Sequence, residues 1–261
     1  MRPLSSDGKA MRKNILLIYL FTLLPLSVLA QIGEHRDEFA IGVSGGYALS
    51  RVSFVPDVQQ KMKGGPIVGV TFRYTTEKYF SSICALVAEV NYASIGWKQD
   101  ILSLIDEPVI NPTTQLAEEY ERQINYVQIP FLARLGWGRE RKGLQFFFQV
   151  GPQMGFMLSE KTVANYPLDQ RNLEMRSSVV VAQESMPVEK KFDYGITGGI
   201  GLEYSHPKIG HFLVEARYYY GLGNIYGNTK RDYFARSNFN NIVIKASYLF
   251  DIAKTKNNKI K

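Results

Sequence analysis

The stretch from Leu144 to Leu158 separates into two chemically different faces when every second residue is read. A period of two over this length predicts a strand with different surroundings on its two sides. Pro152 cannot donate to a strand ladder, so we expect a local irregularity there, such as a bulge. The apolar face comprises Leu144, Phe146, Phe148, Val150, Pro152, Met154 and Phe156, and the small polar face comprises Gln145, Gln149, Gly151, Gln153 and Gly155.

Seven further segments repeat this alternation, which gives eight predicted strands, most of them near the 9 to 11 residues of a tilted membrane strand. The connections between them are alternately long and short. Because strands that run up and down place every other connection at the same end, the long loops share one end and the short turns the other. This asymmetry is typical of outer-membrane barrels. The strands are expected at residues 39–49, 67–74, 83–95, 124–137, 144–158, 192–204, 212–222 and 239–250.

The N-terminal region has the features of a secretory signal peptide. Arg12 and Lys13 precede an apolar run from Ile15 to Leu24, and small residues stand before Ala30. The run is shorter than the roughly 20 residues that a membrane-spanning helix needs. We therefore predict a cleaved signal peptide over residues 1–30, a barrel over 31–252 and a basic periplasmic tail over 253–261.

The net charge argues against a nucleic-acid partner. The predicted signal peptide holds +3 of the formal +7, and residues 251–261 hold most of the remainder, so the barrel itself is close to neutral. Nucleic-acid binding needs basic residues gathered on one surface. Cys84 is the only cysteine, which excludes an internal disulfide and favours a role as an apolar filler.

The face opposite the apolar one carries a small number of charges of both signs. Arginine or lysine facing lipid at mid-depth costs about 2 to 4 kcal/mol each, so in a membrane these residues must face the lumen. A lumen of eight strands is just wide enough to be filled by side chains. A packed structural network is therefore favoured over the lining of a narrow conduit. The predicted network comprises Arg73, Glu89, Arg134, Gln149, Asp193, Glu203, Glu215, Arg217 and Lys245.

Aromatic residues gather at the ends of the predicted apolar faces. A soluble barrel with its apolar face inward would also alternate, but it gives no reason for this clustering. Amphipathic rings favour the headgroup level of a bilayer, so the pattern favours a membrane barrel. The predicted aromatic girdle comprises Phe39, Tyr74, Tyr92, Trp137, Tyr194, Tyr204, Tyr220 and Phe250.

Residues suited to catalysis or metal binding are sparse. His35, His206 and His211 all fall at the short-turn end, and we interpret His206 and His211, which flank a Pro-Lys turn, as polar turn residues. An enzyme would need such groups near the opposite rim, so enzymatic activity is disfavoured, and no spacing resembles a zinc or calcium site. The acidic loop at 96–123 is a solvated loop or a surface for a partner or cation. The run 179–182 has strand character that would extend the wall or offer an edge to a partner.

Several strand segments resemble the PorT-type outer-membrane barrels of the Bacteroidetes. They are NYVQIPF at 125–131, GGIGLEY at 198–204, RYYYGLGNI at 217–225 and YLF at 248–250. The resemblance implies an eight-stranded outer-membrane barrel and, through the founding member, a role in protein export by the type IX secretion system. Gln128 stands where relatives often have an acidic residue. The family contributes no catalytic residues.

Together these patterns predict an all-β protein, an eight-stranded antiparallel up-and-down transmembrane barrel of the bacterial outer membrane. We expect a monomer with long loops outside, termini in the periplasm and no cofactor or metal. Its expected partners are outer-membrane lipid and other envelope or secretion proteins. A structural or interaction role is the main functional hypothesis. A narrow channel is the alternative, and an outer-membrane enzyme is less favoured.

Overall fold

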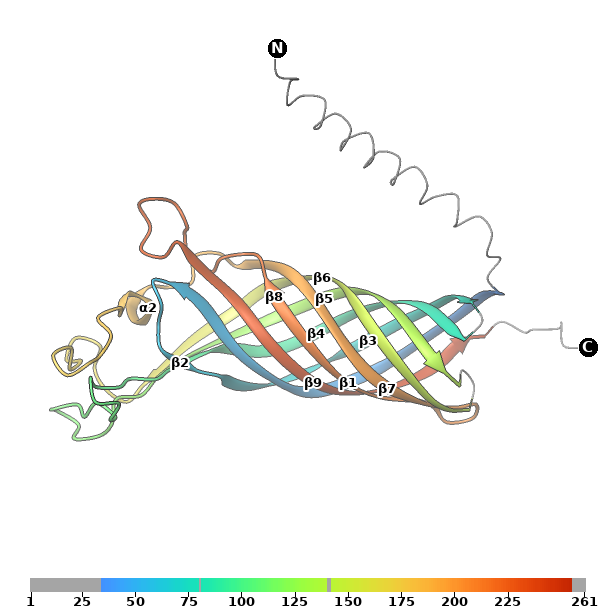
Figure 1. Ribbon diagram of the computed structural model, residues 1–261, viewed down its shortest axis with the longest axis horizontal. Helices are drawn as coiled ribbons and strands as arrows, with labels where there is room; N and C mark the ends of the chain where they lie inside the picture. Colours follow the sequence, from blue (N-terminus) through green and yellow to red (C-terminus); the bar gives the residue numbers. More distant parts are fainter. Residues whose placement is uncertain (1–33, 80, 140–141, 255–261) are drawn as a thin grey trace, which may run out of the picture.

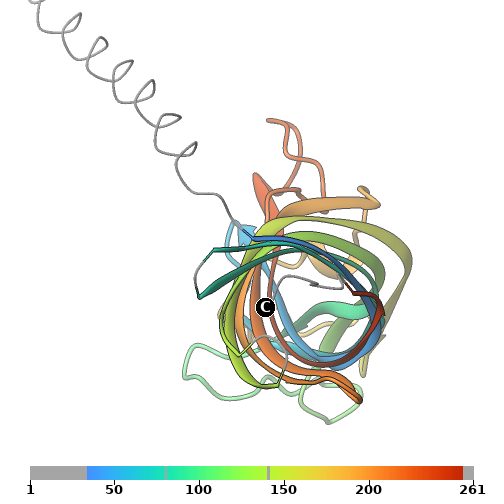
Figure 2. The same ribbon diagram turned by 90° about the vertical axis from the view of Figure 1, so that its right-hand side faces the viewer.

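Eight long antiparallel strands form one closed barrel in the computed structural model, which describes residues 34–79, 81–139 and 142–254 (Figures 1 and 2). Each strand pairs with its neighbours in sequence, and pairing of the first with the last closes the wall. The strands are β1 (Glu34–Val55), β3 (Lys63–Tyr79), β4 (Ser82–Gln99), β5 (Tyr120–Gly138), β6 (Gly143–Ala164), β7 (Phe192–His206), β8 (Gly210–Gly221) and β9 (Arg236–Ala253); β2 (Gln60–Lys61) adds a short pairing to β4, and α2 (Ala182–Ser185) is a single helical turn.

The order of the strands confirms the predicted up-and-down topology. The connections at 80–81, 139–142 and 207–209 are short and lie at one end, which we call the short-turn end. The connections at 56–62, 100–119, 165–191 and 222–235 lie at the other, the long-loop end. Phe39 pairs with Ala253, so the start of β1 and the end of β9 meet at the short-turn end (Figure 1).

The wall extends beyond the predicted strands at the long-loop end. Residues 50–55 of β1 pair with residues 236–241 of β9, and residues 120–123 of β5 pair with residues 161–164 of β6. The sequence prediction stopped where the apolar alternation stopped. Backbone pairing continues past that point, because it satisfies N–H and C=O groups whatever the side chains are.

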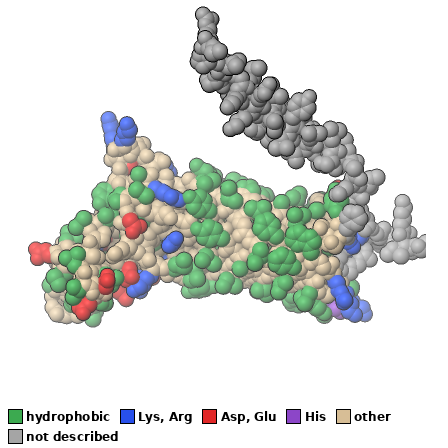
Figure 3. Space-filling model, viewed as in Figure 1, with side chains coloured by type: hydrophobic (Ala, Val, Ile, Leu, Met, Phe, Trp, Pro, Cys, Tyr) green, Lys and Arg blue, Asp and Glu red, His purple; other side chains and the backbone are tan. Residues whose placement is uncertain are grey.

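The outer surface of the barrel is apolar over its middle. Figure 3 shows hydrophobic side chains over the central part of the wall and charged ones toward the two ends. The predicted girdle residues all lie on the outer side, with Phe39 half-buried and the others exposed. Tyr92, Tyr194 and Tyr220 lie toward the long-loop end, and Phe39, Tyr74, Trp137, Tyr204 and Phe250 toward the short-turn end.

The irregularity expected at Pro152 is not a bulge. The register between β5 and β6 stays constant from Pro130 to Ala133, but the pairing between these two positions is interrupted. Proline supplies no N–H, so the ladder loses bonds without changing register. The shift in register between these strands falls at Asn125 and Tyr126 instead. Beside the interruption, the outer face has an apolar hollow of about 540 Å³.

Parts of the predicted domain organisation lie outside the described residues. These are the signal peptide over 1–30 and the tail from residue 255 onward. Over the described ranges, the chain forms no helix with the length and apolar character that crossing a bilayer requires.

Candidate functional site

The half of the lumen toward the short-turn end holds a buried cluster of four charges from β4, β8 and β9. Arg217 donates from both terminal nitrogens to the Glu89 carboxylate, at 2.8 and 2.6 Å, and lies 2.7 Å from Glu215. The Lys245 amine lies 2.6 Å from Glu89 and 3.2 Å from Glu215. Two cations thus face two anions. Buried charges need this balance, because an unpaired one pays a desolvation penalty of several kcal/mol.

A second cluster continues from the first through Gln149. Its amide nitrogen donates to Glu215 at 2.6 Å, and its amide oxygen accepts from Arg134 at 3.2 Å. Arg134 also donates to Glu203 at 2.9 Å, and Arg73 donates to the other oxygen of Glu203 at 2.6 Å. Eight of the nine predicted network residues therefore form one continuous set of contacts across the lumen.

Glycines on β7 make room for this network. A Cβ at Gly199 would lie 2.8 Å from the Arg217 side chain, and one at Gly201 would lie 2.4 Å from the Phe147 ring. Phe147 in turn packs under Arg134, whose guanidinium carbon lies 3.6 Å from the ring centroid. The sequence GITGGIG thus presents small residues to the lumen where large charged side chains from neighbouring strands need the space.

Asp193, the ninth predicted residue, lies apart from the ionic network. It is buried and accepts a hydrogen bond from the Tyr219 hydroxyl at 2.7 Å. Among the described residues it has no ion pair. Its partner is an aromatic side chain, because this part of the lumen is no longer lined mainly by charges.

The sequence prediction missed three polar residues at the short-turn end of the network. His211, interpreted as a turn residue, points into the lumen and contacts Glu203 at 2.8 Å, Ser205 at 2.9 Å and Asp251 at 3.0 Å. Asp251, which was counted only with the charges of the terminal residues, lies in β9 opposite Ala40. The alternation of inward and outward residues continues to His211 and Asp251. Because both fall on inward positions, the alternation could have identified them as lumen residues.

The Ser205 hydroxyl, the His211 imidazole and the Asp251 carboxylate follow one another as in serine hydrolases, but they are enclosed. Ser205 is 1% exposed and also contacts Glu203 at 3.2 Å. A nucleophile needs an open face at which a substrate carbonyl can approach. The three residues therefore anchor the end of the ionic network. In the described part of the chain, no group of three or more potential ligands is arranged to hold a metal ion.

The other half of the interior is filled by apolar and aromatic side chains. Phe54 stacks edge-on to Trp97 with ring centroids 5.4 Å apart and lies 4.9 Å from Phe234. Tyr126 packs edge-on to Phe239 at 5.8 Å. All five rings are buried. The prediction did not include this core, because it read the inward face as polar along the whole barrel.

The long loops at 100–119 and 165–191 fold over this core as a cap. Arg176 donates to Glu118 at 2.6 and 2.9 Å and to Glu184 at 2.6 Å, and Arg171 reaches Glu184 at 3.2 Å. Burial opposes the charge on Arg176, but Glu184 and Glu118 outweigh it and raise its pKa. Arg122 donates to backbone carbonyls of α2, including that of Gln183 at 3.2 Å. The cap is thus fixed to the barrel wall by charge-assisted hydrogen bonds.

Two expectations about these loops were wrong in part. Glu118 of the acidic loop is buried in the cap and paired, although other acidic residues of that loop are exposed. The run 179–182 forms neither a strand nor an edge, because residues 179–181 are irregular and Ala182 begins α2. Its apolar side chains Val180 and Ala182 instead pack against the aromatic core.

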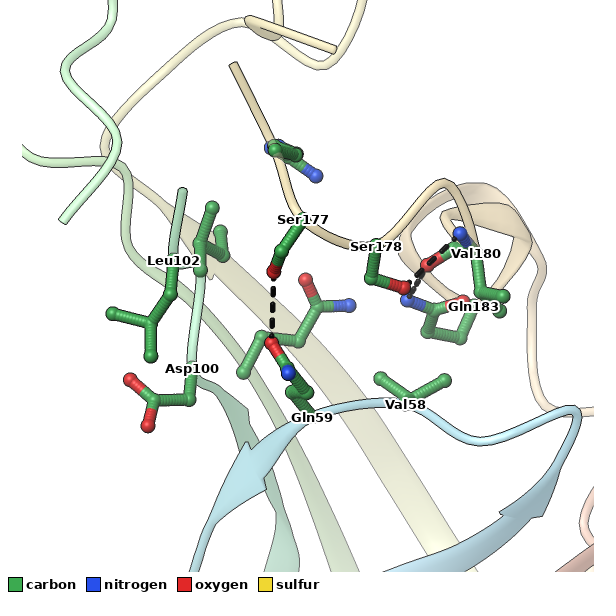
Figure 4. Close-up of a pocket in the computed structure, with 11 residues that line it drawn as sticks. Val58, Gln59, Asp100, Leu102, Ser177, Ser178, Val180 and Gln183 are labelled. Carbon is green, nitrogen blue, oxygen red and sulfur yellow. Dashed lines mark hydrogen bonds between the residues drawn. The ribbon is translucent and has the colours of Figure 1, made fainter. Parts of the chain in front are cut away.

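A small cavity lies where the cap meets the wall, beside Val58, Leu102 and Gln183 (Figure 4). Ser177 from the cap donates to Gln59 at 3.2 Å across it. Its volume is about 20 Å³, which is room for about one water molecule. This cavity is a joint between cap and barrel and is too small for a ligand.

Comparison with known proteins assigns the chain to a family. The model of the outer membrane protein beta-barrel domain family matches residues 29–227. The chain belongs to this family. Membership places this barrel protein in the bacterial outer membrane, so its apolar outer face meets lipid. No curated protein matches the chain. The finer PorT-type resemblance stays a prediction.

Solved outer-membrane barrels are similar to this family member at low sequence identity. Ail, the attachment invasion locus protein of Yersinia pestis, is 15% identical, with 82% of this chain and 99% of Ail covered and a TM-score of 0.36. OprG of Pseudomonas aeruginosa is 12% identical, with 84% and 98% covered and a TM-score of 0.39. Neisserial surface protein A is 9% identical, with 81% and 97% covered and a TM-score of 0.38.

Proposed function

We propose that this outer-membrane barrel is an interaction module whose rigid wall holds a cap of long loops at the cell surface. The observation that carries the proposal is the division of the interior into a neutralised ionic network and an aromatic core. Both fill the lumen with side chains that contact one another. The chemistry open to a partner is therefore on the cap.

The proposed orientation has the long loops outside the cell and both termini in the periplasm. Outer-membrane barrels have short periplasmic turns and longer external loops. The start of β1 and the end of β9 meet at the short-turn end, so this orientation puts both of them on the periplasmic side.

A narrow channel is the weaker alternative. A conducting path would need polar groups free to exchange with ions or water, whereas Arg217, Lys245 and Arg134 each contact a carboxylate within 3 Å. The purified protein should give no discrete conductance in planar bilayers. Steps that change when Arg134 is neutralised would instead support the channel.

An enzymatic function is also not proposed. His211 contacts both Ser205 and Asp251, but Ser205 is enclosed by the wall and by Glu203. The resemblance to PorT-type barrels makes protein secretion or envelope assembly the process in which we propose that the module acts, as a monomeric barrel that contacts other envelope proteins.

Purification from native membranes after chemical crosslinking tests this proposal. We expect envelope or secretion proteins to be recovered with the barrel, and deletion of the gene to reduce export of surface cargo. Recovery of the barrel without any crosslinked protein, together with unchanged export, would contradict an interaction role in secretion.

A further inference from the structure

We propose that the tip of the cap is a docking groove for a polypeptide segment that combines apolar side chains with lysine or arginine. This inference deepens the proposed function and rests on it. The groove lies between the loop at 100–119 and the loop at 165–191 and has a volume of about 390 Å³. Leu104, Ile105, Pro108, Ile110 and Met175 form its apolar surface.

These apolar residues are unusually exposed for a loop in water. Leu104 is 85% exposed and Ile105 is 74% exposed, and Met175 from the other loop is also exposed. They do not face lipid, because they belong to loops that extend from the end of the barrel (Figure 1). A contiguous patch of exposed apolar side chains indicates an interaction surface, whereas single exposed apolar residues are common and need no explanation.

The charged side chains that line the groove are of one sign, and the neighbouring Arg171 and Arg176 are paired with Glu184 and Glu118. Glu107 and Glu174 are its charged lining residues, and Asp106 stands next to Glu107 in the chain. In the part of the chain that the structure describes, these three carboxylates have no ion pair, whereas Glu118 and Glu184 in the same loops do. Figure 3 shows acidic and hydrophobic side chains together at this end. A cationic partner would supply the missing counter-charge.

The walls of the groove are held in place before any partner arrives. Ser103 donates its N–H to the carbonyl of Glu107 at 2.8 Å, which closes the turn at the tip. Asn172 connects the two loops, since its side chain donates to the carbonyl of Ile110 at 3.1 Å and its N–H to Glu118 at 2.8 Å. A rigid groove loses little conformational entropy on binding, which favours affinity.

The acidic rim decides between a polypeptide and a second membrane as the occupant. Membrane surfaces that attract peripheral proteins are anionic and recruit basic residues. Glu107 and Glu174 would be repelled by such a surface. A basic, apolar polypeptide satisfies both the charge and the exposed side chains of the groove.

Selection from a random 12-residue peptide library displayed on phage tests the proposal, with the full-length protein in lipid nanodiscs as the target. The groove variant is Ile105→Ser/Met175→Ser. The matched control is Leu116→Ser/Val179→Ser, which removes two exposed apolar side chains of the same loops that do not line the groove. Heat-dependent gel mobility verifies that each variant is a folded barrel.

We expect selected peptides to be enriched in lysine or arginine next to apolar residues. They should bind the groove variant at least about tenfold more weakly, a loss of about 1.4 kcal/mol, because the variant lacks two of the apolar anchors. They should bind the control variant as they bind the wild type, and Glu107→Gln/Glu174→Gln should weaken binding and reduce its dependence on salt.

The docking groove is contradicted if the selected peptides are acidic, if they bind the groove variant and the control variant equally, or if no peptide is enriched. It is also contradicted if the wild type binds vesicles containing anionic lipid and Ile105→Ser/Met175→Ser does not, which would assign the tip to a membrane. If any of these results occurs while crosslinking still recovers envelope proteins, the docking groove is wrong and the interaction role stands.

Discussion

Replacement of Glu89 by glutamine should strongly destabilise the barrel. Glu89 is 1% exposed and accepts hydrogen bonds from Arg217, Lys245 and Asn91 at distances of 2.6 to 2.9 Å. Glutamine keeps the shape of the side chain but removes the negative charge. Glu215 then faces two cations alone, and the cluster carries an uncompensated positive charge in the barrel interior.

The expected cost follows from the loss of one partner of a buried ion pair. Breaking such a pair costs about 3 to 5 kcal/mol, because the remaining charge stays desolvated. With a denaturant dependence of about 2 kcal/mol per molar urea, this corresponds to a midpoint lower by roughly 1.5 to 2.5 M. The double variant Glu89→Gln/Lys245→Met restores neutrality and should recover most of this loss.

The assay is reversible urea unfolding in lipid vesicles, followed by tryptophan fluorescence. Trp97 lies in the aromatic core and Trp137 in the girdle, so the signal reports both the interior and the lipid contact. A midpoint for Glu89→Gln within about 0.5 M of the wild type would refute the reasoning, as would a double variant no more stable than the single one, because the network would then contribute little through charge balance.

Two pairs of substitutions test the orientation of the wall and the role of the cap. Phe148→Glu should reduce assembly in the membrane, measured as the heat-modifiable fraction, far more than Gln149→Glu does, because Phe148 points outward and Gln149 into the lumen; equal tolerance would reverse the assigned faces. Arg176→Ala should leave the barrel folded but increase proteolysis of the cap loops, because it leaves Glu118 buried without a cation and Glu184 with Arg171 alone. Arg171→Ala, at a more exposed position, should have a small effect, and unchanged cleavage in Arg176→Ala would show that other contacts hold the cap.

The alternation of side chains was sufficient to predict the strand order and the inward side of each strand. Glu203 and Arg217, for example, lie in the neighbouring strands β7 and β8. The alternation of apolar and polar residues in each strand was enough to predict that both side chains point into the lumen, where both are buried. Strand ends were predicted less well, because residues 50–55 continue the ladder without an apolar outer face. Backbone hydrogen bonds form whatever the side chains are, so these strand ends could not be predicted from the side chains.

The partners of the network residues could not be predicted. His211 and Asp251 kept the inward phase, but they lie beside a turn and near a charged tail, where polar residues are common. The cap was also missed, since the contact of Arg176 with Glu118 joins residues 58 positions apart in loops without periodicity. Such contacts depend on how two loops fold over the core in three dimensions.

Labelling of single cysteines in intact cells tests most directly whether the barrel presents its cap at the cell surface. In a Cys84→Ser background, Val179→Cys places a thiol on the cap and Lys208→Cys places one in the turn at the short-turn end, both at exposed positions. We predict that a membrane-impermeant maleimide labels Val179→Cys in intact cells and labels Lys208→Cys only after the outer membrane is permeabilised. Labelling of Lys208→Cys but not Val179→Cys in intact cells would contradict the proposed orientation and, with it, the function assigned to the cap.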